Sequence, residues 1–500
     1  MRIICPPRLK KLNQARPNSI KVSLKAAALT ALLALSAPAL SAESYQAPDI
    51  GTAGITGMTV QREKQVGEYF MRMARSHLAI ADDPVLNEYL DTVGNKLVAH
   101  AHNVRFPFKF FIVKNAALNA SAFLGGKIQV NTGLFHYADS EDEFASVLAH
   151  EISHVTQRHI ARYIEAQSRS SSLTVAGMIG AVAMAIINPA LGAAALSTTV
   201  GISAQSGINF TRENEAEADR IGIGLLYDAG FNPEGMCDMF RKLMSMQGKI
   251  NAAYSMLIDH PLSEVRLAEA QERVAQLPKR HNSTNADFSF AKARIEVRYT
   301  EHRDLEELRQ RFLNTKGLNK LYRNYGLALV CFEQKNYAQA REYLQALEGY
   351  RNNIFVLDLL TDIDLASHNG LMAVNRLQEA LRSHPDNQVV VINLANACLE
   401  TSQAARAVKV LNTYLGRHPD NTLALDLLAK ASFKLKDRCN ALQAQGQLSA
   451  LYANYGRAVS SYNEALNSCP GAYSRDVLQA RLVQLSEQRA FDEAIEKGLK

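Results

Sequence analysis

The 500-residue sequence predicts an α+β domain, mostly helical with a small sheet, followed by an all-α solenoid of paired helices. The first prediction rests on apolar residues at helical spacing in 61–100 and in 140–168, with strand-like runs between these two segments. The second rests on a 34-residue period in the last third of the chain. We therefore expect a first domain at 43–276, a connecting segment at 277–318 and the solenoid at 319–500.

Residues 1–42 have the composition of a secretory signal peptide. This segment holds seven lysines and arginines and no acidic residue, with an apolar core at 26–35 and mostly small residues at 36–42. A membrane anchor is the alternative, but the apolar core is shorter than the roughly 20 residues that span a bilayer. Without the seven charges, the formal net charge falls from +6 to −1. The remaining chain therefore offers no electrostatic case for binding nucleic acid.

Two short segments ahead of the second helical segment predict the sheet. The run 106–113 is rich in aromatic and β-branched residues, and 127–131 alternates polar and apolar residues after Gly125 and Gly126. A sheet edge beside the following helix would bind an extended polypeptide by strand addition. The alternative is that 127–131 is an ordinary internal strand.

The helix expected over 140–168 carries the motif H-E-x-x-H. His150 and His154 lie four residues apart, so one helix face presents both imidazoles to a single metal ion. Glu151 is placed to take a proton from a water molecule without binding the ion itself. Zinc bound by two histidines and a carboxylate keeps an open position for water, as in hydrolytic zinc enzymes. The alternative is a chance match, expected in roughly 2% of chains with this histidine content.

The acidic run at 213–219 offers the third metal ligand. On a helix, Glu215 and Asp219 share one face, whereas Glu217 points elsewhere. We assign Glu215 to the metal, and Asp219 to a supporting role in which its carboxylate orients a ligand histidine. A solvated acidic helix face is the alternative. His260, which precedes a proline, would by itself be an ordinary loop residue.

The segment 170–211 contains no charged residue and is rich in Ala, Gly, Ile, Met and Ser. Asn188-Pro189 predicts a turn inside it. We favour two short helices or a mobile loop that lies against the site and gates access to it. A membrane-dipping helix, with contact to the membrane surface, is the alternative.

Five cysteines follow the predicted signal peptide, widely spaced and without a C-x-x-C pair. This spacing excludes a small disulfide scaffold. In an oxidising compartment one or two disulfides could form, and the odd number implies a free thiol. Otherwise we expect the cysteines to be small buried apolar residues.

Beyond the charged segment 277–318, the chain becomes repetitive. The sequence His-Pro-Asp-Asn at 384–387 recurs 34 residues later at 418–421. A 34-residue period is typical of tetratricopeptide repeats, in which helix pairs stack because a single pair cannot bury its apolar face. The stacked pairs form a concave surface that binds other proteins. Residues that share this period are Gly326, Leu360, Leu394 and Leu428 in one series, and Ala373, Ala407 and Ala441 in another.

H-E-x-x-H followed by E-x-x-x-D, in an exported chain with tetratricopeptide repeats, resembles one family. Over essentially the whole chain after the predicted signal peptide, the sequence is similar to the BepA-type periplasmic zinc metallopeptidases, relatives of HtpX and the CAAX prenyl proteases. Residues 118–126 and 130–134 match the family's strand and turn before the catalytic helix, and 209–222 match its third-ligand segment. The resemblance implies a zincin-like metallopeptidase fold for the first domain.

The resemblance also implies roles for individual residues. His150, His154 and Glu215 would bind one zinc ion per chain, and Glu151 would be the general base. His260, in the matching His-Pro-Leu segment, would correspond to an extra histidine that can occupy the fourth zinc position and restrain activity. A fourth protein ligand has this effect because it closes an open catalytic site.

The implied function is that of a zinc endopeptidase and assembly chaperone of the periplasm. It would serve quality control of outer-membrane β-barrel proteins and degrade misassembled precursors. Its repeats would bind the β-barrel assembly machinery and the lipopolysaccharide-transport barrel. The alternative is a tetratricopeptide chaperone or scaffold with a structural or regulatory metal site. Glu151 argues against this alternative, because a structural site has no use for a general base.

Overall fold

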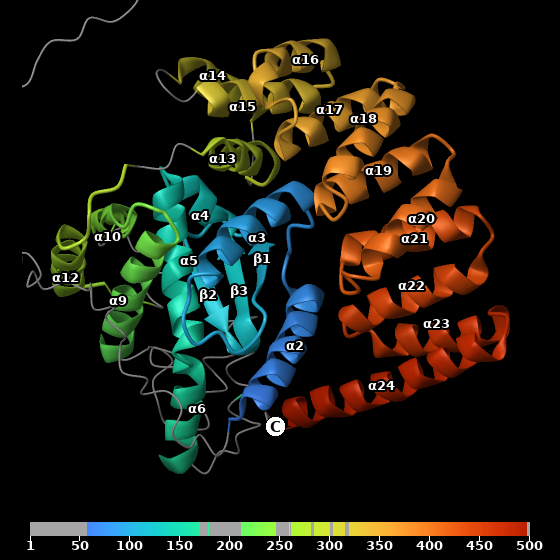
Figure 1. Ribbon diagram of the computed structural model, residues 1–500, viewed down its shortest axis with the longest axis horizontal. Helices are drawn as coiled ribbons and strands as arrows, with labels where there is room; N and C mark the ends of the chain where they lie inside the picture. The colour runs from blue at the N-terminus through green and yellow to red at the C-terminus, as the bar shows by residue number, and fades with distance from the viewer. Residues whose placement is uncertain are drawn as a thin grey trace, which may run out of the picture. The chain divides into compact units, whose positions relative to one another are not determined.

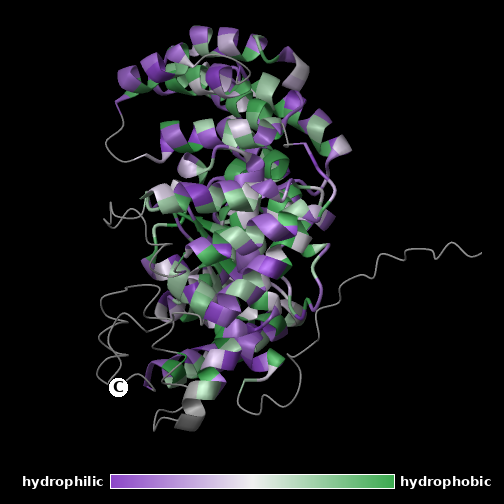
Figure 2. Ribbon diagram, turned by 90° about the vertical axis from the view of Figure 1, so that its left-hand side faces the viewer, coloured by the Kyte–Doolittle hydropathy of each residue, from purple (hydrophilic) through white to green (hydrophobic). Residues whose placement is uncertain are grey.

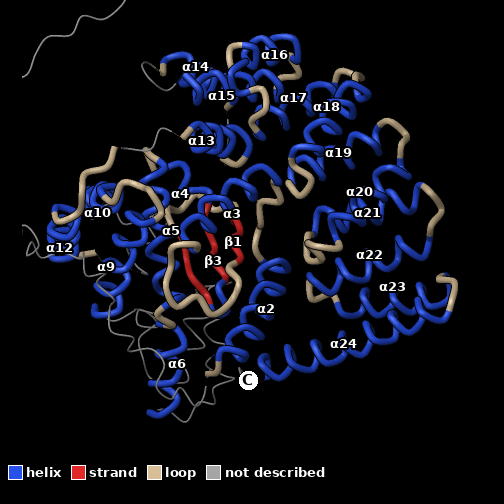
Figure 3. The backbone as a smooth tube through the Cα atoms, in the orientation of Figure 1, coloured by secondary structure: helices blue, strands red, loops and turns tan. Residues whose placement is uncertain are grey.

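The computed structural model describes residues 58–170, 179, 212–246, 260, 262–281, 285–300, 304–315 and 320–497. Helices dominate this part of the chain, with one small sheet near its beginning (Figures 1 and 3), which confirms the predicted fold class. The predicted signal peptide and the uncharged segment at 171–211, apart from Ile179, lie outside the described residues. No described helix combines the length and the apolar character needed to cross a bilayer.

Two helices precede the sheet, α2 (Val60–His77) and α3 (Pro84–Val98). The side chain of Thr59 caps α2, and Asp83 caps α3 by accepting hydrogen bonds from two backbone N–H groups of its first turn. Pro84 fits the first position of α3, where its missing N–H would have no helical partner in any case. Both helices begin where the sequence places caps, so their starts are locally encoded.

The sheet has three strands in the order β1-β3-β2, with β1 parallel and β2 antiparallel to β3. Gly125 and Gly126, in the turn between β2 and β3, have φ of +70° and +75°, which only glycine adopts without strain. The central place of β3 confirms that 127–131 is an internal strand. The edge strand beside the helix with the H-E-x-x-H motif is β2, which the sequence did not predict. The strands are β1 (Lys109–Val113), β2 (Ala120–Phe123) and β3 (Lys127–Asn131).

The predicted helix over 140–168 is two helices, α5 (Glu141–Thr156) and α6 (His159–Ser170). The prediction of one continuous helix is wrong because Arg158 has a φ of +55°, which ends the helical path. The side chain of Arg158 is buried, and its Nε donates to Oε1 of Glu63 at 2.6 Å. At the other end, Ser140 caps α5 by accepting from the backbone N–H of its third residue.

Three later helices surround α5: α9 (Arg212–Asp228) and α10 (Glu234–Met246) pack on it, and α12 (Glu264–Ala275) packs on both of them. Gly235 allows α10 to approach closely, since a Cβ there would lie 2.5 Å from the carbonyl carbon of Asp142. The carboxylate of Asp142 also accepts the backbone N–H of Asn232 at 2.9 Å. Because α3 and β2 also pack on α5, every residue of α5 is buried, and its polar motif residues lie inside the domain.

Five helix pairs follow, as the 34-residue period predicts. The first helices of the second, third and fourth pairs begin 34 residues apart, and an asparagine caps each of them: Asn353, Asn387 and Asn421. Hydrophilic and hydrophobic residues are mixed along the helices of the described chain, as in helices with one buried face (Figure 2). The pairs are α15 (Lys320–Glu333) and α16 (Tyr337–Gln345), α17 (Ile354–Ala366) and α18 (Gly370–Ser383), α19 (Gln388–Glu400) and α20 (Ala404–Leu415), α21 (Thr422–Lys434) and α22 (Arg438–Leu451), and α23 (Tyr455–Ser468) and α24 (Ala472–Lys497).

The predicted connecting segment 277–318 is itself largely helical, with α13 (Ala286–Arg298) and α14 (Leu305–Asn314). Arg294 of α13 is buried, and its guanidinium lies 2.7 Å from the carboxylate of Asp83 and 2.7 Å from that of Asp358. Asp83 caps α3, and Asp358 belongs to α17, so one arginine joins the first domain to the repeats. The hydrophobic core runs through this junction from α3 to α17.

The last helix, α24, has 26 residues and returns to the beginning of the described chain (Figure 1). Asp492 of α24 forms a buried ion pair with Arg72 of α2, with a hydrogen bond of 2.9 Å from Nε. Ile495 also belongs to a hydrophobic cluster with residues of α2 and α6. The repeats are therefore attached to the first domain at both of their ends.

One disulfide joins Cys439, near the start of α22, to Cys469, directly after the end of α23. Cys237, Cys331 and Cys398 are buried free thiols. This distribution agrees with the expectation of one or two disulfides and otherwise buried cysteines.

Candidate metal centre

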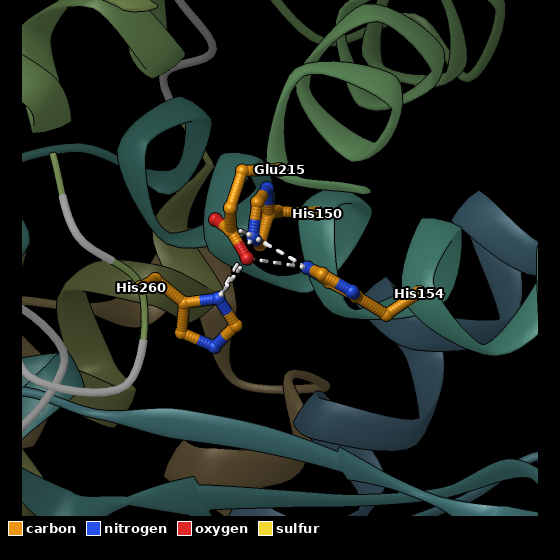
Figure 4. Close-up of side chains that lie close together, drawn as sticks. All are labelled: His150, His154, Glu215 and His260. Carbon is orange, nitrogen blue, oxygen red and sulfur yellow. Dashed lines mark hydrogen bonds and ion pairs between the residues drawn. The ribbon is translucent and has the colours of Figure 1, made fainter. Parts of the chain in front are cut away.

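Three segments bring together four side chains that could bind one metal ion (Figure 4). The helix α5 supplies His150 and His154, α9 supplies Glu215, and the segment before α12 supplies His260. All four side chains are buried, and one ligand atom of each lies within 4.8 Å of the others. The two histidines leave α5 on the same face because they are four residues apart, and α9 packs along that face.

The spacing of the donor atoms suits a tetrahedral zinc ion. With bonds of about 2.1 Å, neighbouring donors around zinc lie about 3.4 Å apart. Nε2 of His150 lies 2.9 Å from Nε2 of His154 and 3.3 Å from Nδ1 of His260. The carboxylate of Glu215 lies 3.5 Å from each of the two α5 nitrogens and 3.0 Å from Nδ1 of His260. Imidazole nitrogens with one carboxylate are also a donor set that zinc prefers, so the residues fit the ion.

Two of the four candidate donors are in the forms that bind a metal ion, whereas the pKa values of His150 and His260 are raised, so these two rings would release a proton on binding. Burial opposes ionisation of Glu215, but the charge of His260 and hydrogen bonds from His150 and His260 lower the pKa of its carboxyl. Burial lowers the pKa of His154, which keeps its imidazole neutral. An ionised carboxylate and a neutral imidazole are the forms that bind a metal ion.

Glu151 lies beside the four donors without being one of them. Its side chain is buried, and burial raises the pKa of its carboxyl. Oε1 of Glu151 lies 3.5 Å from Nε2 of His260. The backbone N–H of Ala122, in the edge strand β2, donates to the same carboxyl group. A carboxylate whose pKa is raised is a stronger base than an exposed one, which suits a group that accepts and releases a proton beside the donor set.

Asp219 contacts a donor histidine, in the way that its predicted supporting role requires. Its Oδ1 lies 3.0 Å from Nδ1 of His150. Burial opposes ionisation of Asp219, but hydrogen bonds from His150 and Arg266 lower its pKa. The catalytic and supporting roles assigned to Glu151 and Asp219 stay predictions, although the geometry places both residues at the site.

Arg266 is a residue of the site that the sequence did not predict. Its Nε and Nη2 donate to the carboxylate of Asp219 at 2.7 and 2.9 Å, and its Nη1 lies 2.9 Å from Oε2 of Glu215. The guanidinium thus offsets the charge of both carboxylates. The sequence offered one indication, because Arg266 follows His260 by six residues in the same segment.

Comparison with known families matches both parts of the chain. The profile of Peptidase family M48 matches residues 84–274, which contain all four donor residues. The profile of the tetratricopeptide repeat matches residues 365–431, which cover α18 to α20 and most of α21.

Proteins with similar sequences are named as proteases. The Beta-barrel assembly-enhancing protease of Yersinia pestis is 40% identical over 337 residues, which are 67% of this chain and 69% of that protein. The protein of the same name from Escherichia coli (strain K12) is 39% identical over 354 residues, 70% of this chain and 73% of that one. Metalloprotease LoiP of Escherichia coli (strain K12) is 25% identical over 244 residues, 47% of this chain and 86% of its own length.

Proposed function

The chain belongs to peptidase family M48 as a metalloendopeptidase of the beta-barrel assembly-enhancing protease family, and we propose that its metal is zinc and its substrates are misassembled outer-membrane β-barrel proteins. The observation that carries this proposal is the buried set of donors whose spacing suits a tetrahedral ion. His150, His154 and Glu215 would hold the zinc ion. When bound there, zinc would supply Lewis-acid chemistry, activating water and polarising the scissile carbonyl.

Glu151 is the proposed general base. Its carboxylate takes a proton from the attacking water and passes it to the nitrogen of the leaving amine. The raised pKa of Glu151 suits this exchange, because a carboxyl group that holds its proton more tightly is a better acceptor at neutral pH. Asp219 keeps His150 oriented, and Arg266 keeps Asp219 and Glu215 in place.

The edge strand β2 is the proposed guide for an extended substrate. β2 pairs with β3 on one side and packs beside α5, which carries Glu151. A polypeptide added to the edge of β2 that no described strand covers would be held through backbone hydrogen bonds, largely independent of its side chains. The scissile bond would then lie beside the donor set. This mode suits misassembled proteins, which share exposed extended segments rather than one sequence.

His260 is the proposed brake on this activity. Its Nδ1 lies within 3.3 Å of donor atoms of both His150 and Glu215, so it completes a set of four protein donors. Four protein ligands are typical of structural zinc sites, whereas catalytic sites keep one position open. Cleavage would therefore require His260 to move away from the other donors.

The repeats would present substrates to the site and dock the protein on its partners. We propose the periplasm as the compartment, consistent with the predicted signal peptide at 1–42 and with the disulfide between Cys439 and Cys469. The proposed partners are the β-barrel assembly machinery and the lipopolysaccharide-transport barrel. The peptidase domain would span 43–276 and the repeats 319–500. The proposed chaperone activity would promote assembly and the peptidase activity would remove stalled precursors.

Glu151→Gln tests the proposed mechanism. The amide keeps the size of the side chain but accepts protons poorly, so the variant should bind one zinc ion per chain and lose cleavage of casein. Glu272→Gln, at an exposed position of α12, is the matched control and should cleave like the unmodified protein. If Glu151→Gln cleaved casein at the unmodified rate, the assignment of the general base would be wrong.

The four-donor arrangement also favours a second candidate function, a repeat chaperone whose metal is structural or regulatory. The two functions predict different outcomes of a rescue experiment in cells. Full rescue of a β-barrel assembly defect by Glu151→Gln would favour the chaperone, and absence of rescue would favour the peptidase.

A further inference from the structure

Each metal-binding histidine of α5 uses Nε2 toward the cluster and needs a hydrogen-bond partner at Nδ1. That partner fixes the orientation of the ring and the tautomer that leaves Nε2 free for a metal ion. For His150 the nearest candidate is the carboxylate of Asp219, whose Oδ1 lies 3.0 Å from Nδ1. For His154 it is another imidazole, because Nδ1 of His154 lies 2.8 Å from Nδ1 of His159, the first residue of α6.

A chain of hydrogen bonds continues from His159 to a charged pair. Nε2 of His159 lies 3.1 Å from Oε2 of Glu217, on α9. Nη2 of Arg162 donates to the same oxygen at 2.9 Å. The side chain of His159 has no solvent exposure, so its two ring nitrogens are held between His154 and Glu217. A buried imidazole thus connects a metal-binding histidine to a carboxylate that does not reach the donors itself.

In this series of hydrogen bonds, His154 at one end and Glu217 at the other determine which atom donates each proton. When Nε2 of His154 serves as a ligand, the ring proton lies on Nδ1 and is donated to Nδ1 of His159. His159 then carries its own proton on Nε2 and donates it to the carboxylate of Glu217, which only accepts. Every link has one donor and one acceptor, so the chain stabilises the tautomer of His154 that binds a metal ion.

A break in the backbone makes the contact between His154 and His159. On a continuous helix, residues five apart point about 140° away from each other and would not meet. Arg158, with a φ of +55°, turns the chain between α5 and α6. The side chain of Arg158 locks this turn, donating to Glu63 and, at 2.6 Å, to the carbonyl of Met58. These buried contacts hold the turn that brings His159 back toward His154.

We propose that His159 and Glu217 are positioning residues of the metal centre, which hold His154 in the orientation and tautomer that its Nε2 requires. The inference rests on the metal site proposed above and assigns to that site two residues beyond the motif. Both act through His154 and touch neither the metal position nor the substrate, so their loss should weaken metal binding and alter the coordination geometry. Glu151 would keep its place as general base.

The test measures metal binding in the full chain, without reference to proteolysis. The protein is stripped of metal and titrated with zinc in competition with a chromogenic chelator, and the visible spectrum of its cobalt(II) form reports the geometry. His159→Phe keeps a ring but removes both nitrogens, and should weaken zinc affinity about 10- to 100-fold. His159→Gln offers an acceptor and a donor again, and should recover part of the loss. Glu217→Gln keeps an acceptor for His159 and should lose less than His159→Phe.

The matched control is His384→Phe, at an exposed position of the repeat region, which should leave zinc affinity unchanged. Unfolding of the metal-free variants separates a positioning role from a purely structural one. Zinc affinity of His159→Phe within twofold of the unmodified protein, or equal loss in His159→Phe and His159→Gln with an equal loss of metal-free stability, would overturn the inference. Should His159→Phe fail to fold, the affinities and cobalt spectra of His159→Gln and Glu217→Gln decide. An unmodified protein that binds no zinc would refute the proposed function instead.

Discussion

Arg266 is the cation between the two buried carboxylates of the metal centre, and its removal tests how their charge is balanced. Its guanidinium lies 2.7 and 2.9 Å from the oxygens of Asp219 and 2.9 Å from Glu215. Arg266→Met would keep much of the side-chain volume and leave both carboxylates without this partner. Removing one partner of a buried ion pair costs about 3–5 kcal/mol of unfolding free energy. We expect the metal-free variant to lose an amount in this range.

Bound zinc should reduce this loss, because the ion places positive charge beside the same carboxylates. The prediction is therefore a difference between two measurements, urea unfolding of the metal-free protein and of the zinc-saturated protein. Arg266→Lys is the matched control, since it keeps the charge but lacks the planar fork that reaches both carboxylates. It should recover only part of the loss. A loss below about 1 kcal/mol in the metal-free variant, or an equal loss with and without zinc, would refute the reasoning.

Three further predictions concern activity, pH and the disulfide. His260→Ala should raise the rate of casein cleavage about tenfold if the closed four-donor arrangement is populated about nine times in ten; loss of cleavage as complete as in Glu151→Gln would instead make His260 part of the catalytic apparatus. Burial raises the pKa of Asp91 from 3.8 to about 6. The folded state therefore binds a proton at Asp91 more tightly than the unfolded state does, and the free energy of unfolding falls as the pH rises from about 3.8 to about 6. Asp91→Asn should therefore stabilise the protein against urea at about pH 7.5 and not below about pH 3.8; an equal effect at both pH values would contradict the sign. The disulfide Cys439–Cys469 closes a loop of 30 residues. Its reduction should lower the stability of the last repeats by about 3–4 kcal/mol and leave zinc affinity unchanged. Thermal unfolding and zinc titration, each with and without reductant, would measure the two effects.

The parts of the site that could be predicted are those that a helix encodes locally. His150 and His154 share a face because they are four residues apart, and so do Glu215 and Asp219. The repeats could be predicted for a similar reason, because each 34-residue unit repeats the same short-range pattern of caps and buried small residues. In both cases the relevant spacing lies within one or two helices.

The parts that could not be predicted depend on contacts between distant segments. Arg266 reaches the site only because α12 packs on α9 and α10. β2 consists of Ala120-Ser-Ala-Phe123, residues without strong strand preference apart from the last, and it is a strand because β3 pairs with it. The composition of 277–318 is that of a charged linker, yet one of its charged residues, Arg294 of α13, is buried between two carboxylates.

The helix α9 shows how the side chains of one short acidic run make three different sets of contacts. Successive helix positions turn by about 100°, so Glu215 and Asp219 lie about 40° apart and Glu217 lies on roughly the opposite side. The sequence places Glu217 away from the face of Glu215 and Asp219, but geometry on α9 alone does not say what it contacts. The turn at Arg158 supplies the answer, because it places His159 and Arg162 of α6 against Glu217. The side chain of Glu217 is 20% exposed, so it is not part of a solvated acidic face. The contacts of the acidic residues on one helix can therefore be assigned only when the path of the preceding helix is known.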